Sequence, residues 1–133
     1  MDLGQAVKSV FSKYATFKGR APRSEFWFWI LFTTLAGMGV GILDHAVDFL
    51  AGYDYGSIAG AWGLATILPF LAVSVRRLHD TDRAGWWLLL FFIPFFGGLV
   101  LIVWFCTKGT TSYNRFGPDY FLPGGYAIRR PRA

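Results

Sequence analysis

The residues of this chain best suited to chemistry are His79 and Asp80, which are adjacent in the stretch RRLHDTDRAGWW. A histidine held by a carboxylate is a common general base, but neighbouring residues of a helix point about 100° apart, so adjacency alone does not form the pair. If a helix continues past Val75, Arg76 and Asp80 stand four residues apart and face one another. This spacing predicts an ion-paired helix end whose arginines meet lipid phosphates, with a proton-handling or substrate-binding His79 as the alternative.

Asp44, His45 and Asp48 form a second group of ionisable residues, at the end of an apolar segment. Asp44 and Asp48 are one helical turn apart, so their carboxylates share a face and could hold a cation or relay protons. His45 does not share that face, which argues against a zinc site. We therefore favour a polar cap at a membrane boundary for this group.

No sequence motif for catalysis accompanies these residues. The chain contains no phosphate-binding loop, no serine nucleophile elbow and no zinc-binding pattern, and its single cysteine, Cys106, cannot form an internal disulfide. We predict no catalytic residue, no metal site and no cofactor.

The composition indicates a membrane environment. Of the 133 residues, 54% are hydrophobic and 16% are charged, a balance far more apolar than that of soluble domains. The formal charge of +5 matters mainly through its placement, because Lys and Arg beside membrane spans orient a protein and attract anionic lipid. A basic nucleic-acid-binding protein would carry such charge on a soluble fold, so we expect no nucleic-acid partner.

The elements that position these residues are predicted to be helices throughout, which makes the fold class an all-α membrane protein. Residues 2–18 carry apolar side chains at helical spacing, which predicts an amphipathic helix that lies in the membrane interface or docks on the rest of the protein. We expect residues 1–120 to form one polytopic membrane domain and residues 121–133 a flexible basic tail. The segments that are apolar and long enough to cross a bilayer are about residues 26–48, 57–75 and 86–107.

The third apolar segment can follow one of two paths. Its length favours a single span, which puts the tail on the side of the membrane opposite the N-terminus. Pro94, Gly97 and Gly98 could instead bend it into a re-entrant hairpin that returns the tail to the N-terminal side. The Lys and Arg residues before the first span and between the second and third predict a cytoplasmic N-terminus, and the five basic residues after the third segment agree with this only for the hairpin.

Glycines at four-residue intervals indicate two helix faces suited to close packing. Gly37 and Gly41 lie in the first span, and Gly56 and Gly60 lie at the second. Such spacing lets helix backbones approach closely, either among the spans or against a second subunit. Because three spans bury few helix faces, we expect a homo-oligomer or a larger membrane-protein partner.

Four motifs occur in order along the chain: FKGRAPRSEFWFWILF, RRLHDTDRAGWWLLL, IPFFGGLVLIVWF and KGTTSYNRFGPDY. Together they resemble the domain-of-unknown-function 805 family of small bacterial inner-membrane proteins, over roughly residues 11–120. One departure is Asp82, at a position where we expect glycine. The resemblance implies a bacterial inner-membrane location, but this family has no established activity, so it carries over no catalytic residue.

These observations favour a role without catalysis, as an interaction or accessory subunit of a membrane assembly. The boundary residues expected to contact anionic lipid headgroups or a protein partner are Arg20, Arg23, Arg76, Arg77, His79, Asp80, Asn114 and Arg115. With the hairpin, all of them could gather on one cytoplasmic surface. With a single third span, Asn114 and Arg115 lie on the opposite side of the membrane.

Two other functions remain as alternatives. A small transporter or channel component would use Asp44, Asp48 and His79 to line a path, and this requires charges well inside the spans. An enzyme that modifies lipid would depend on His79 and Asp80 alone.

Overall fold

The computed structural model describes residues 2–54 and 57–119, and these residues form five helices and no strand. The helices in chain order are α1 (Leu3–Ser12), α2 (Arg23–Ala51), α3 (Ser57–Asp80), the 3₁₀ helix η1 (Gly85–Phe92) and α4 (Phe96–Cys106). The prediction of an all-α fold is confirmed for this part of the chain. The basic tail predicted for residues 121–133 lies outside the described residues.

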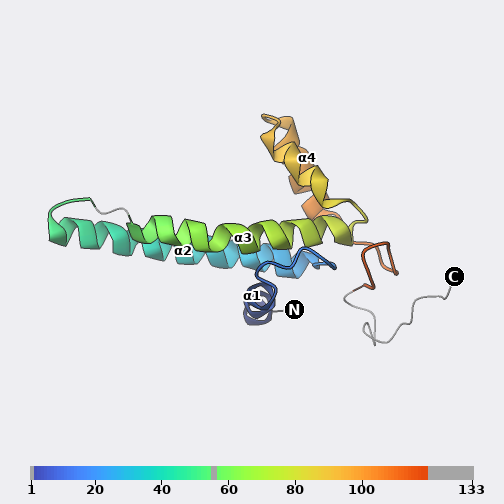
Figure 1. Ribbon diagram of the computed structural model, residues 1–133, viewed down its shortest axis with the longest axis horizontal. Helices are drawn as coiled ribbons and strands as arrows, with labels where there is room; N and C mark the ends of the chain where they lie inside the picture. Colours follow the sequence, from blue (N-terminus) through green and yellow to red (C-terminus); the bar gives the residue numbers. More distant parts are fainter. Residues whose placement is uncertain (1, 55–56, 120–133) are drawn as a thin grey trace.

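Helix α1 begins with a capping box. The Asp2 side chain accepts a hydrogen bond from the Gln5 backbone N–H at 2.8 Å, and the Gln5 side chain accepts one from the Asp2 N–H at 3.1 Å. The helix ends at Ser12, so it is shorter than the predicted 2–18. Its apolar face, with Ala6 and Val10 fully buried, packs on α2, and α1 is seen end-on where it crosses the other two helices (Figure 1).

Helices α2 and α3 pack side by side as a long antiparallel pair (Figure 1). Helix α2 ends at Gly52, whose positive φ of 78° suits a residue without a side chain. Both helices are long and apolar enough to cross a membrane, over Arg23–Ala51 and Ile58–Asp80. They are longer than the predicted 26–48 and 57–75, because α2 extends by three residues at each end and α3 continues beyond Val75 through its polar last residues to Asp80.

The third apolar segment is not one helix but two, η1 and α4, so the single span that its length favoured is not confirmed. Helix η1 and α4 run antiparallel, since Trp87 near the start of η1 contacts Trp104 near the end of α4, with ring centroids 5.6 Å apart. The turn between them places Phe95 at a φ of 65°. A Cβ on Gly97 would lie 1.6 Å from the Leu90 carbonyl oxygen, so only glycine fits where the chain folds back. A third transmembrane segment is therefore not confirmed, and the alternative hairpin is the path observed.

The hairpin brings the chain back to the end of α3. Residues 107–119, here called the return segment, pass beside the loop that precedes α2 and the last turn of α3. The buried apolar core lies at this same end, where α1, α2, α3 and α4 meet, and consists of Val10, Ala21, Phe26, Trp29, Val73, Leu78, Leu101 and Phe105. We call the end of the molecule where this core lies the basic end. The distal end, where α2 ends and α3 begins, has only the two helices (Figure 1).

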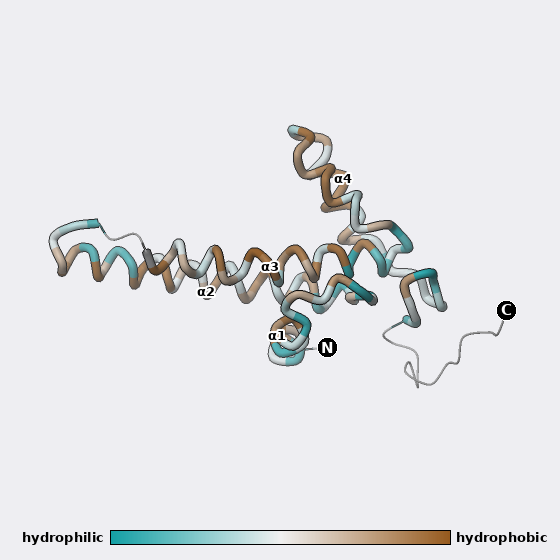
Figure 2. Tube along the Cα trace, in the orientation of Figure 1, coloured by the Kyte–Doolittle hydropathy of each residue, from teal (hydrophilic) through white to brown (hydrophobic). Residues whose placement is uncertain are grey.

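The apolar residues outside that core face outward. Figure 2 shows hydrophobic residues along α3 and α4, with hydrophilic residues at the distal tip and in the loops of the basic end. Exposed examples are Ile42 at 72% and Leu64 at 76%, in the middle of the two long helices. Such surfaces are typical of helices that meet lipid or other membrane helices.

The predicted glycine faces are only partly used within this chain. A Cβ on Gly37 would lie 3.3 Å from the Trp62 indole nitrogen, so Gly37 allows α2 and α3 to pack closely. Gly41 and Gly60 have open space around them, and Gly56 lies outside the described residues. Packing of these glycines against a second subunit stays a prediction.

Candidate functional site

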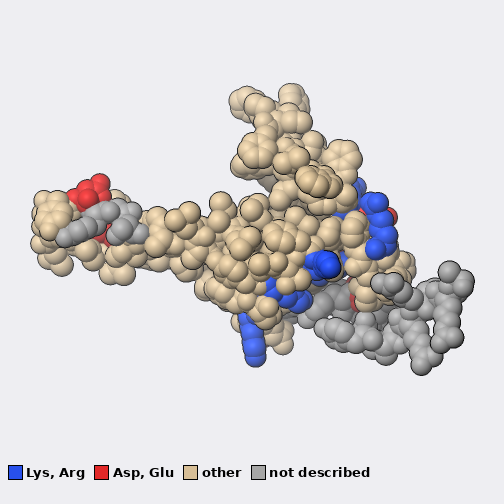
Figure 3. Space-filling view, viewed as in Figure 1, with Lys and Arg blue, Asp and Glu red and all other residues tan. Residues whose placement is uncertain are grey.

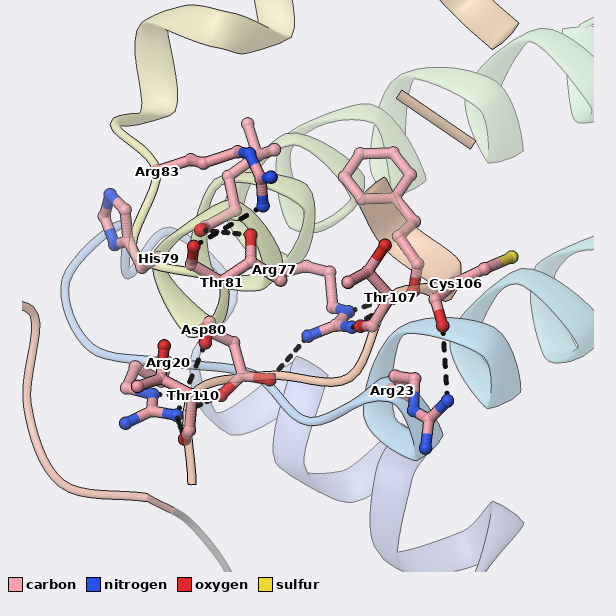
Figure 4. Close-up of polar contacts among 12 residues, drawn as sticks. Arg20, Arg23, Arg77, His79, Asp80, Thr81, Arg83, Cys106, Thr107 and Thr110 are labelled. Carbon is pink, nitrogen blue, oxygen red and sulfur yellow. Dashed lines mark hydrogen bonds and ion pairs between the residues drawn. The ribbon is translucent and has the colours of Figure 1, made fainter. Parts of the chain in front are cut away.

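Asp80 is the centre of a buried cluster of charged side chains at the basic end. Arg20 contacts one carboxylate oxygen, with Nε at 2.9 Å and Nη2 at 2.8 Å, and Nη1 of Arg77 lies 2.5 Å from the other. Figure 4 shows these three side chains in contact, and each is at most 7% exposed. Buried charges are tolerated only when they are paired in this way. Asp80 therefore neutralises two arginines and does not orient His79.

Arg20 also binds the return segment. Its guanidinium group donates to the carbonyl oxygens of Ser112 at 2.8 Å and Gly117 at 3.2 Å, and to that of Thr110. The Thr110 backbone N–H donates in turn to the Asp80 carbonyl at 2.8 Å. Arg20 thus joins the loop before α2, the end of α3 and the return segment, and its planar group with several donors suits this role.

Arg77 holds the end of the apolar hairpin. Its Nε and Nη2 each donate to the Phe105 carbonyl at 3.2 Å, and Nη2 also donates to the Thr107 carbonyl. The last carbonyls of a helix have no partner within the helix and carry partial negative charge, so they suit a guanidinium group. Arg77 therefore fixes the end of α4, where the chain leaves the hairpin.

His79 positions the return segment. Its Nδ1 lies 3.0 Å from the Gly19 carbonyl, which can only accept, so we assign the ring proton to Nδ1. The ring stacks on Phe116, with centroids 3.9 Å apart and planes 3° from parallel. The Asn114 side chain donates to the His79 carbonyl at 2.9 Å. The pairing of His79 with Asp80 that the alternative of a lipid-modifying enzyme would require is not formed, and both side chains bind other parts of the chain.

Arg76 points away from this cluster, so the predicted pairing of Arg76 with Asp80 is wrong. Its Nη1 lies 2.7 Å from Oε1 of Glu25, and the two side chains are 1% and 0% exposed. Ser9 of α1 donates to the same Glu25 oxygen at 3.2 Å. Sequence reasoning missed Glu25. The signal was available, because the start of one helix lies beside the end of the next in an antiparallel pair, and these two residues occupy those positions.

The five arginines predicted to contact lipid headgroups thus fall into two groups. Arg20, Arg76 and Arg77 are buried within the chain, at 8%, 1% and 0% exposed. Arg23 and Arg115 are exposed, and Arg115 pairs with Asp82 at 3.2 Å on the surface. Of these five arginines, Arg23 and Arg115 are exposed enough to meet a lipid surface.

Asp82 adopts a φ of 58°, in the left-handed region that glycine enters at no steric cost. This backbone shape explains why the family resemblance leads one to expect glycine there. Aspartate is among the few other residues that adopt this conformation.

The acidic residues of the distal end do not join this site. One oxygen of the buried Asp44 accepts a hydrogen bond from the Ala59 backbone N–H at 3.2 Å, which caps the first turn of α3. His45 is exposed. The length of α3 separates Asp44 from His79, so they do not line one local site. In residues 2–54 and 57–119 no three His, Cys, Asp or Glu side chains gather closely enough to hold a metal ion.

Two neighbouring hollows lie at the basic end, between the start of α2 and the end of α4. One is a cavity of about 290 Å³ lined by Arg23, Ser24, Asp80, Lys108, Gly109, Thr111 and Asp119. The other is a groove of about 440 Å³ lined by Arg23, Ser24, Trp27, Phe28 and Cys106. We call them the polar cavity and the apolar groove.

The described residues form a small helical protein with two helices that are long and apolar enough to cross a membrane. Its apolar hairpin is hydrogen-bonded to the end of α3 by a buried arginine, Arg77. The chain belongs to the family described as "Protein of unknown function (DUF805)", which matches residues 14–118. The resemblance in the sequence motifs is therefore confirmed.

Three relatives from Escherichia coli (strain K12) show the extent of the similarity. Inner membrane protein YhaI is 46% identical over 111 residues, which cover 84% of this chain and 91% of the relative. Inner membrane protein YhaH is 44% identical over 110 residues, which cover 83% and 91%. Uncharacterized protein YiiR is 40% identical over 112 residues, which cover 80% and 70%. No solved structure matches the chain.

Proposed function

We propose that this chain is a multi-pass protein of the bacterial inner membrane that acts as an interaction or accessory subunit of a membrane assembly, with its N-terminus and basic end in the cytoplasm. The observation that carries this proposal is the separation of charge along the α2–α3 pair. No Lys or Arg occurs between Arg23 and Arg76, and the distal end has Asp44, Asp48 and Asp54. On the face drawn in Figure 3, the basic side chains lie at the basic end, together with a few acidic ones, and the charged side chains at the distal tip are acidic.

This separation supports one orientation. Positive residues next to spans stay in the cytoplasm, and the hairpin path keeps the return segment on the same side as the N-terminus. Helix α1 crosses α2 at the level of Trp29, where the ring of Phe11 contacts it edge-on at 5.2 Å. A helix that crosses a span in this way lies along the membrane plane, as an interfacial helix does.

The surface of the hairpin supports a partner. Its tip exposes large apolar side chains, with Phe92 at 78%, Phe95 at 93% and Phe96 at 74%. A turn that enters the hydrocarbon must be covered by protein, because its backbone groups cannot be satisfied by lipid. A second copy or a larger membrane protein would supply this cover, and the open Gly41 and Gly60 offer a face for close helix packing.

Cysteine labelling tests the orientation. In a Cys106→Ser background, one variant carries Ser112→Cys in the return segment and a matched variant carries Asp54→Cys at the distal end, both at exposed positions. An impermeant thiol reagent applied to intact Escherichia coli spheroplasts should label only the distal cysteine, and should label both after lysis. Labelling of residue 112 before lysis would contradict the proposed orientation.

Native mass spectrometry from lipid nanodiscs tests the assembly. We expect a defined mass above that of one chain, as an oligomer or a stoichiometric complex, and a lower mass for Gly41→Leu combined with Gly60→Leu. A monomer at all concentrations, with no stoichiometric protein partner, would contradict the accessory role.

A further inference from the structure

The polar cavity has the features of an oxyanion site. Arg23 and Lys108 are exposed basic side chains that line it. The Ser24 hydroxyl is buried and has no hydrogen-bond partner among the described residues. Two residues of the cavity wall, Arg23 and Ser24, are the first residues of α2, and this helix has no side-chain cap, so the positive end of its dipole lies beside the cavity. These groups together favour a phosphate oxygen.

Two carboxylates also line the cavity, and they do not make the net charge around it negative. Asp80 is neutralised by Arg20 and Arg77, one on each oxygen. Asp119 is the other. Counting these groups with the two exposed cations, four basic side chains surround two carboxylates, which leaves a positive balance.

The apolar groove continues from the cavity, since Arg23 and Ser24 line both. Its other walls are Trp27, Phe28 and Cys106, which offer aromatic surface and no charge. The Arg23 guanidinium group donates to the Cys106 carbonyl at 3.2 Å and so spans the seam between α2 and α4 (Figure 4). A polar site that opens into an apolar one suits a ligand with a charged head and a hydrocarbon chain.

We propose that the two hollows together bind one anionic glycerophospholipid. Its phosphate lies in the polar cavity against Arg23, Lys108 and Ser24, and one acyl chain lies in the apolar groove against Trp27 and Phe28. The two volumes together fall within the roughly 300–1,000 Å³ of small-molecule sites. This inference rests on the proposed function, because it assumes that the basic end lies at the level of the lipid headgroups.

The test uses full-length protein in a neutral detergent, titrated with phosphatidylglycerol, phosphatidylcholine or inorganic phosphate and followed by native mass spectrometry. We expect one phosphatidylglycerol to bind preferentially. Arg23→Gln with Lys108→Gln should weaken its affinity about 30-fold, and each single substitution about fivefold, from the usual contribution of a basic residue near anionic lipid. The matched control, Lys8→Gln with Lys18→Gln, removes two exposed charges that line neither hollow and should change the affinity by less than about twofold.

A second pair of variants tests the source of the phosphate. Trp27→Ala should weaken phosphatidylglycerol binding and leave any inorganic phosphate binding unchanged, whereas Trp86→Ala, an exposed tryptophan outside the groove, should change neither. Equal affinity for inorganic phosphate and phosphatidylglycerol would overturn the lipid assignment in favour of a free anion. If the Arg23 and Lys108 double variant and the Lys8 and Lys18 control lose the same affinity for phosphatidylglycerol, the binding comes from general surface charge and the proposed site is wrong.

These outcomes are separable from those of the proposed function. The binding measurement in detergent depends neither on orientation nor on a partner. If cysteine labelling places the basic end in the cytoplasm and the Arg23 and Lys108 variants bind lipid as the natural chain does, the lipid site alone fails. If labelling reverses the orientation and the variants lose lipid, the proposed function fails and the site stands. Far-UV circular dichroism checks that the single variants keep their helical content.

Discussion

The two ends of the α2–α3 pair are built in different ways. At the distal end the interactions are local: Gly52 ends α2, and Asp44 caps α3 at a residue 15 positions away. At the basic end the partners are far apart in sequence: Asp80 follows Arg20 by 60 positions, and Arg76 follows Glu25 by 51. The distal end is therefore a turn between two helices. The basic end is built from segments far apart in the chain and can present a binding site.

The largest effect should come from Asp80→Asn. This change leaves Arg20 and Arg77 buried without their carboxylate, which typically costs about 3–5 kcal/mol of stability. We expect a lower midpoint of thermal unfolding in detergent and faster trypsin cleavage in the return segment. Asp54→Asn, at the exposed distal loop, is the control and should change neither. A similar small effect of both substitutions would remove the distinction between the two ends.

Gly97→Ala should come next. The new methyl group would collide with the Leu90 carbonyl, so the η1–α4 hairpin must open, at a cost of about 1–3 kcal/mol. Gly98→Ala is a close control, because a Cβ there meets nothing within 4 Å and alanine favours a helix. Thermal unfolding and the fluorescence of the Trp87 and Trp104 contact should separate the two variants. Equal stability of both would show that the chain does not fold back here.

Asp44→Ala should have a smaller effect that stays at the distal end. Loss of a helix cap costs about 1 kcal/mol. Amide hydrogen exchange should rise in the first turn of α3 and remain unchanged in the return segment. Faster exchange at Thr110, whose N–H binds the Asp80 carbonyl, would show that the two ends are coupled.

The smallest effect should come from Arg115→Gln, although it lies at the basic end. Its pair with Asp82 is 61% and 49% exposed, and exposed pairs contribute about 0.2–1 kcal/mol. We expect a shift of the unfolding midpoint near the limit of measurement, and less in high salt. A loss as large as that of Asp80→Asn would mean that burial does not rank the interactions at this end.

The sequence predicted the helices of the α2–α3 pair well, because long uncharged segments admit few other structures. It was less accurate for the third segment, where length favoured one span and Pro94 with Gly97 favoured a turn. We gave more weight to the length, and the turn was established only by the position of Leu90 against Gly97. The pairing of Arg76 was predicted wrongly because spacing along one helix pointed to Asp80, whereas the neighbouring helix supplied Glu25.

By itself, the sequence determined the all-helical class, the two long apolar helices, the family and the concentration of basic residues around one end. These follow from composition and from patterns within short segments, where local geometry decides which residues share a face. Only the tertiary structure decided that the hairpin returns the chain, that Arg20 and Arg77 share Asp80 inside the protein, and that Arg23 and Lys108 stay exposed beside a groove. Those outcomes depend on contacts between residues far apart in the chain. The neighbouring sequence of a charged residue does not tell whether its side chain is buried in an ion pair or exposed to bind a phosphate.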